Sequence, residues 1–120
     1  MSQLLREVRV FCEGGPGIGG GHLSRCAALG AAWAHMGGAC TFRVNRDAPP
    51  GFQPQGCGVE RLEDPLDLSC WPPFPLGVLG VVDSYRIDSR WLDQAANRLP
   101  LVAVDDGRSF PLEEQVGGVL

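Results

Sequence analysis

A glycine-rich stretch near the N-terminus, GGPGIGGGHLSRC (residues 14–26), constrains this chain more than any other feature. Six of its first eight residues are glycine. It lies between a run typical of a strand, Glu7 to Glu13, and a run typical of a helix, His22 to Met36. Glycine backbone can take positive φ values and approach a ligand closely, and the free N–H groups of a first helical turn point at whatever lies above them. The helix dipole adds about half a positive charge there, so the stretch predicts a phosphate or pyrophosphate site.

Two side chains add chemistry to this stretch. His22 opens the helix and Arg25 follows three positions later, so both lie on one face of the first turn. The dipole disfavours a protonated histidine at this end, and a neutral imidazole suits a general base. Arg25 could hold a phosphate or a carboxylate through two parallel hydrogen bonds. On residue types alone, the alternative stays open that His22 caps the helix and Arg25 is solvated.

Length, composition and charge restrict the class of protein. The 120 residues predict one domain, residues 1–120, and 44% hydrophobic with 20% charged residues is ordinary for a soluble globular protein. The net charge of −4 gives no support to a nucleic-acid partner. No apolar run approaches the roughly 20 residues of a membrane-spanning helix. The N-terminus lacks the apolar core of a signal peptide, so we expect no membrane association.

The five cysteines form neither a CxxC pair nor a cluster with histidine at metal-ligand spacing. An odd number of dispersed cysteines is typical of free thiols in a reducing compartment. The sequence therefore predicts five buried thiols, no metal site and a cytoplasmic protein.

Strand-like and helix-like segments alternate along the rest of the chain. Gly37 and Gly38 end the first helix, and a proline-rich loop follows the second strand. We predict strands at 39–44, 59–62, 76–82 and 101–104, a further strand opening in the C-terminal VGGVL, a helical turn at 66–71 and a helix at 88–98 that starts from Asp88 or Ser89. This alternation predicts an α/β fold: a Rossmann-like parallel sheet with flanking helices.

Three polar clusters follow predicted strands. They are the glycine-rich stretch with His22, the segment Asp83-Ser84-Tyr85, and the pair Asp105-Asp106. Ligands of such folds bind beyond the carboxyl ends of the strands, so we expect the three clusters to share one pocket. The alternative for the acidic residues is helix capping and loop solvation.

Known nucleotide motifs fit only weakly. Gly15, Gly17 and Gly20 match G-x-G-x-x-G, but the acidic residue expected after the second strand is at best Asp47. A Walker A loop is excluded because no Gly-Lys-Ser/Thr follows the glycines. The only other histidine, His35, is predicted to lie at the surface.

A resemblance to a known family fits better. The segment IGGGHLSRCAALGAAW resembles the IG-x-GH-x-x-R-x-x-x-L-A signature of the UDP-sugar hydrolases of pseudaminic acid biosynthesis and of the related spore coat polysaccharide proteins. VVDSYRIDSRWL and LVAVDDG are similar to that family's VVD-x-Y segment, its helix with a tryptophan and its strand ending in paired aspartates. Order and spacing agree from about Val8 to Gly107.

The resemblance implies one half of a GT-B-like architecture, in which two Rossmann-like domains flank the active-site cleft. The second, C-terminal domain would hold most of the nucleotide, and it would lie outside residues 1–120. The resemblance further implies inverting hydrolysis between the anomeric carbon and UDP, releasing 2,4-diacetamido-2,4,6-trideoxy-L-altrose. The substrate is then a UDP-sugar, no cofactor is needed, and the isolated domain should be nearly inactive.

Site residues follow position by position. His22 would be the base for the attacking water, and Asp83 and Tyr85 would lie near the sugar as further catalytic residues. The residues expected to bind substrate are Gly19, Gly20, Gly21, Arg25, Asp105 and Asp106. Two alternatives stay open, namely a GT-B glycosyltransferase and a non-catalytic module that binds an anion or a nucleotide.

Overall fold

The described part of the chain forms a parallel sheet between two helical layers. The computed structural model describes residues 6–15, 21–84, 87–104 and 118–119. Within them the strands are β1 (Glu7–Cys12), β2 (Ala39–Asn45), β3 (Gly58–Leu62), β4 (Val78–Asp83), β5 (Leu101–Ala103) and β6 (Gly118–Val119). Their order is β3-β2-β1-β4-β5-β6, and each neighbouring pair is parallel. The predicted Rossmann-like α/β fold is therefore confirmed.

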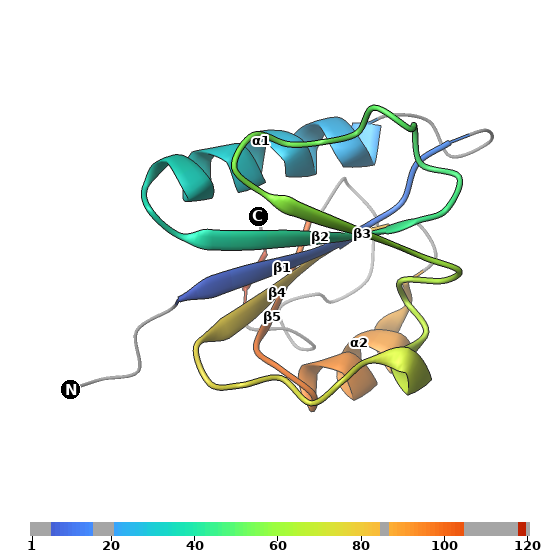
Figure 1. The fold of residues 1–120 in the computed structure, drawn as a ribbon. Coiled ribbons are helices and arrows are strands. Elements are labelled where there is room, and N and C mark those ends of the chain that lie inside the picture. Colours follow the sequence, from blue (N-terminus) through green and yellow to red (C-terminus); the bar gives the residue numbers. More distant parts are fainter. Residues whose placement is uncertain (1–5, 16–20, 85–86, 105–117, 120) are drawn as a thin grey trace.

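The two helices cover opposite faces of the sheet (Figure 1). Helix α1 (Gly21–His35) ends as the glycine pair predicts: Gly37 has φ +92°, and the N–H of Gly38 donates to the carbonyl of Trp33 at 3.1 Å. This arrangement satisfies carbonyls that a helix end leaves open. Helix α2 (Ser89–Ala96) starts from Asp88, whose carboxylate accepts from the N–H of Trp91 at 2.8 Å. Asp88 is thus the N-cap of α2.

Each face of the sheet has its own apolar core. Val10 and Phe42 pack under α1, whereas Phe11 and Val82 pack on the α2 side together with Leu92. Alternate residues of β1 therefore point into different cores, and both faces of the strand are buried. Strands buried on both faces explain the continuous apolar run of β4.

The connection from β3 to β4 replaces a crossover helix by one short turn and aromatic packing. The predicted helical turn at 66–71 is present as a 3₁₀ turn, η1 (Leu68–Cys70), capped by Asp67. Next to it, Trp71 stacks on Phe11 with ring centroids 4.4 Å apart. The Trp71 indole N–H donates to the carbonyl of Pro65 at 3.0 Å, which satisfies its polar atom inside the core.

Two sequence predictions were wrong in detail. The strand expected from Leu76 begins at Val78, because Gly77 turns with φ +89°, and Leu76 lies 79% exposed before that turn. Cys70 is exposed rather than buried, since η1 lies at the surface and the Cys70 thiol donates to the Asp67 carboxylate at 3.5 Å. The other four cysteines are buried, as predicted.

Candidate functional site at the carboxyl ends of β1 and β4

The candidate site lies where the strand order reverses. From β1 the chain proceeds to β2 and β3 on one side, whereas β4 and β5 lie on the other. In open parallel sheets the crevice beyond the strand ends at this switch point is the usual ligand site. Cys12 pairs with Asp83 at the ends of the two strands, so Glu13 and Ser84 are the next residues along each.

Asp83 and Arg25 form a bidentate ion pair across this position. Arg25 Nε donates to Asp83 Oδ2 and Arg25 Nη2 donates to Asp83 Oδ1, both at 3.0 Å. The Asp83 side chain is fully buried, whereas the Arg25 side chain is 43% exposed. Both residues were predicted site residues, and the structure brings them together. The pair fastens the first turn of α1 to the end of β4.

Two thiols lie against this ion pair. Cys26 Sγ donates to Asp83 Oδ2 at 3.7 Å, and its neighbour Cys12 is wholly buried. A hydrogen bond with Cys26, burial and the negative charges of Asp83 and Glu13 all raise the pKa of the Cys12 thiol. Cys12 therefore stays neutral, which suits a wall of the site rather than a nucleophile.

Glu13 is a buried carboxylate that the sequence analysis missed. It is 5% exposed and accepts a hydrogen bond from the hydroxyl of Ser84 at 2.5 Å, and Ser84 is only 1% exposed. Glu13 also lines a cavity of about 450 Å³ with Asn45, Arg46, Asp47, Glu63 and Asp64. One signal could have found it: Glu13 is the first residue after β1, just as Ser84 is the first after β4.

Packing explains the first two glycines of the glycine-rich stretch. A Cβ atom on Gly14 would lie 2.1 Å from Leu23 Cδ1, and one on Gly15, at φ +110°, would lie 2.5 Å from the carbonyl oxygen of Asp47. Asn45 holds the same backbone, since its amide accepts from Gly14 N at 2.9 Å and donates to Gly14 O at 2.8 Å. Glycine at these two positions lets the backbone after β1 approach Leu23 of α1 and the turn after β2 that contains Asp47.

The remaining predicted site residues divide into two groups. Gly21 is the first residue of α1 and His22 the second, so the helix begins within one residue of its predicted start. The side chain of His22 lies outside what the structure describes. The residues Gly19, Gly20, Tyr85, Asp105 and Asp106 also lie outside the described residues.

Two further findings concern metal binding and membrane association in the described part of the chain. No group of three or more His, Cys, Asp or Glu side chains within residues 6–15, 21–84, 87–104 and 118–119 is arranged to hold a metal ion. Over those same ranges, neither helix has the length and apolar character needed to cross a membrane. The site offers the buried carboxylates of Asp83 and Glu13, an arginine held in place by Asp83, and the start of a helix.

Together, the strand order and the polar switch point define a Rossmann-like α/β protein with a candidate ligand site. No family model matches this chain, and no curated protein or solved structure matches it either.

Proposed function

We propose that this chain is the N-terminal, Rossmann-like half of a nucleotide-sugar hydrolase of the pseudaminic acid type. One observation carries the proposal. The glycine-rich stretch leads into α1 beside the switch point, and the first turn of that helix is fixed there by the bidentate bond between Arg25 and the buried Asp83. A helix start at a switch point is a favourable place for a diphosphate.

In the proposed reaction, His22 takes a proton from water as the water attacks the anomeric carbon of the sugar. The bond from that carbon to the diphosphate oxygen breaks, and UDP leaves with the electron pair. Helix N–H groups and the charge of Arg25 favour the negative charge that develops on the leaving group. A helix N-terminus favours a neutral imidazole over a protonated one, and a base requires the neutral form.

The remaining roles rest on the family resemblance. Tyr85 acts next to the sugar, whereas the fully buried Asp83 acts through Arg25, which it orients by the ion pair. Gly19, Gly20 and Gly21 let the backbone approach the sugar and the diphosphate. Asp105 and Asp106, which come shortly after β5 in the sequence, help to shape the pocket. The substrate is a UDP-sugar, the reaction needs no redox cofactor, and a second domain supplies most of the nucleotide contacts.

The test is release of UDP from UDP-2,4-diacetamido-2,4,6-trideoxy-L-altrose by the natural protein that carries this domain. His22→Ala should lower the rate by about 10²-fold or more, because general base catalysis is lost. His35→Ala is a matched control, since His35 lies exposed at the other end of the same helix. Equal rates in the wild type and in His22→Ala would contradict the proposal.

Two further readouts separate the alternatives. Free sugar among the products supports hydrolysis, whereas a new glycoside would assign the domain to a glycosyltransferase. The strand order itself is also that of dinucleotide-binding domains, which favours a nucleotide-binding module as the second candidate. Titration calorimetry decides here: we expect heat of binding with the UDP-sugar, and tight binding of NADH or NADPH instead would favour the second candidate.

A further inference from the structure

Two cysteines, Cys40 and Cys57, lie under α1 at the N-terminal ends of β2 and β3, opposite the strand ends that form the candidate site. The first paired residues of β2 and β3 are Thr41 and Gly58, and Cys40 and Cys57 directly precede them. Neighbouring parallel strands lie about 4.8 Å apart, within the roughly 4.4 to 6.8 Å between Cα atoms that a disulfide spans. Both residues belong to the core under α1, so their side chains lie on the same face of the sheet.

The Cys57 thiol donates to the carbonyl of Gln55 at 3.7 Å, and it belongs to the same buried core as the Cys40 thiol. Burial and interaction with the Cys57 thiol raise the pKa of the Cys40 thiol to about 12. Cys40 therefore keeps its proton near neutral pH, and it remains a thiol until Cys57 is oxidised.

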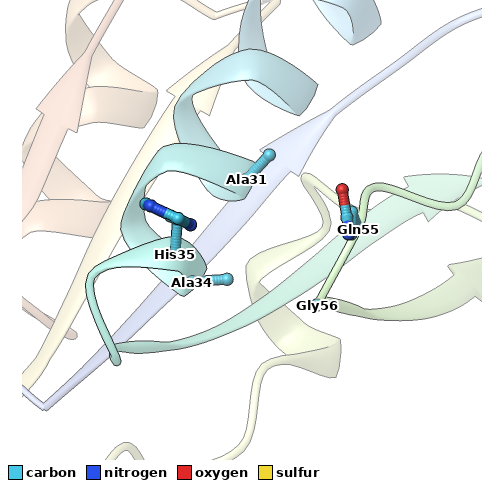
Figure 2. A pocket seen from close by; sticks show the side chains of 5 residues that line it. All are labelled: Ala31, Ala34, His35, Gln55 and Gly56. Atoms are coloured by element: carbon cyan, nitrogen blue, oxygen red, sulfur yellow. The ribbon is translucent and has the colours of Figure 1, made fainter.

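A cavity lies beside the loop that leads to Cys57. It has a volume of about 220 Å³ and lies between the last turns of α1 and the loop before β3. Figure 2 shows its lining: Ala31, Ala34 and His35 from the helix, and Gln55 and Gly56 from the loop. Cys57 directly follows the cavity residue Gly56 in the chain, and Cys40 and Cys57 are 5% and 7% exposed, respectively.

The remaining cysteines lack this combination. Cys12 and Cys26 are also neighbours in the core under α1, but they are at most 1% exposed, and Asp83 lies against them. Cys70 is exposed and bonds to Asp67 and Ser69 rather than to another cysteine.

We propose that Cys40 and Cys57 form an oxidation-sensitive pair, which a small peroxide entering the cavity converts into a disulfide between the starts of β2 and β3. The Cys57 sulfur attacks a peroxide oxygen of H₂O₂ and gives up its proton. The O–O bond breaks, a sulfenic acid forms and one water leaves. The Cys40 sulfur then attacks the Cys57 sulfur, the S–S bond forms and a second water leaves. Two thiols lose two electrons, and the peroxide becomes two waters.

The experiment uses the 120-residue chain with Cys70→Ser, which removes the exposed thiol that would link two copies. The reduced protein is treated with hydrogen peroxide and then with an alkylating agent. Before alkylation, the intact protein should have lost about 2 Da, the mass of two hydrogens. Tryptic digestion should yield peptide 26–43 linked to peptide 47–61, and fragmentation should place the bond on Cys40 rather than on Cys26.

Variants and a second probe keep the outcome decisive. Cys40→Ser and Cys57→Ser should each abolish the linked peptides. In the reduced parent, phenylarsine oxide, which bridges adjacent thiols, should protect Cys40 and Cys57 together from alkylation, a result that needs no substitution in the core. The proposal is overturned if both thiols remain alkylatable after peroxide treatment, or if the linked peptides join Cys12 to Cys26 instead. It does not depend on the proposed hydrolase function.

Discussion

The two partners of the ion pair between Arg25 and Asp83 differ in burial. Asp83 is fully buried, whereas the Arg25 side chain is 43% exposed. Without Asp83 the guanidinium can be hydrated where it lies. Without Arg25 a carboxylate would remain in the interior with its main charge partner gone, and burial strongly penalises such a charge. The cost of breaking the pair therefore depends on which partner is removed.

We predict that Arg25→Met destabilises the fold more than Asp83→Asn does. Removing one partner of a buried pair costs about 3 to 5 kcal/mol, and the exposure of Arg25 brings the expected value to the lower end of that range. Asp83→Asn keeps the shape and a hydrogen-bond acceptor, so we expect about 1 to 2 kcal/mol. Urea denaturation followed by circular dichroism measures both.

Arg90→Met is the control for this comparison. Arg90 lies exposed on α2, so the same change there should alter stability by less than about 0.5 kcal/mol. A larger loss in Asp83→Asn than in Arg25→Met would mean that the fold depends on the carboxylate itself rather than on its neutralisation.

At the scale of elements, α1 lies unusually close to β2 at one glycine. A Cβ atom on Gly30 would lie 2.5 Å from Cε1 and 2.7 Å from Cζ of Phe42, and Phe42 is wholly buried. The ring has no room to withdraw, so the missing side chain sets the distance between helix and sheet.

We expect Gly30→Ala to destabilise the protein although alanine is the better helix former. Alanine gains about 1 kcal/mol of helix propensity, whereas overpacking costs about 1 to 3 kcal/mol and the 2.5 Å approach lies at the severe end. A net loss of about 1 to 2 kcal/mol should appear in urea denaturation. Gly51→Ala is the control, because nothing lies within 4 Å of its Cβ position. A stabilised Gly30→Ala protein would show that helix and sheet can separate at little cost.

The cap of α2 gives a second prediction at this scale. The Asp88 carboxylate accepts from the N–H of Trp91, one of the donors that a helix start leaves without an intrahelical partner. Asp88→Ala should cost about 1 kcal/mol, whereas Asp93→Ala on the exposed side of the same helix should cost clearly less. Thermal unfolding of the two variants checks this, and equal shifts in melting temperature would contradict a capping role.

The sequence was informative wherever the signal is local. Helical periodicity placed α1 within one residue at each end, the glycine pair marked its end, and Asp88 was one of two caps considered. The candidate site depends instead on contacts between distant residues. Arg25 and Asp83 were both predicted to act on substrate, yet they are 58 residues apart and bind each other. Nothing local signals that Arg25 and Asp83 bind each other. For Glu13 and Ser84, only their positions directly after β1 and β4 could have indicated that they meet.

The order of the strands is a property of the whole molecule, and it cannot be predicted from the apolar segments of the sequence. A buried strand can satisfy its backbone hydrogen bonds beside any other strand. The crossover connections therefore decide which strands are neighbours. The same crossovers bring Cys40 beside Cys57 and Cys12 beside Cys26, which dispersed positions in the sequence did not suggest. That four buried thiols lie as two neighbouring pairs is thus a result of topology.

These thiols give the whole molecule a predictable response to alkali. Its ten basic residues are all arginine and it has one tyrosine, so cysteines dominate the titration between about pH 8 and pH 11. Cysteine ordinarily has a pKa of 9.0, whereas burial and the contact with Cys57 raise the pKa of Cys40 to about 12, and the pKa of Cys12 is raised too. Above pH 9 the unfolded chain releases thiol protons that the folded chain retains.

The unfolded state therefore binds fewer protons than the folded state in this range, and the free energy of unfolding falls as the pH rises from 9 toward about 12. Urea denaturation with a reductant present, at about pH 8 and about pH 10.5, should show the midpoint falling. Cys40→Ala should be less stable at the lower pH but should lose less stability between the two, because it removes one of the thiols that hold their protons. Cys70→Ser, which changes an exposed thiol, should keep the wild-type decline. Equal declines in Cys40→Ala and Cys70→Ser would show that the thiol beside Cys57 does not set the alkaline limit of the fold.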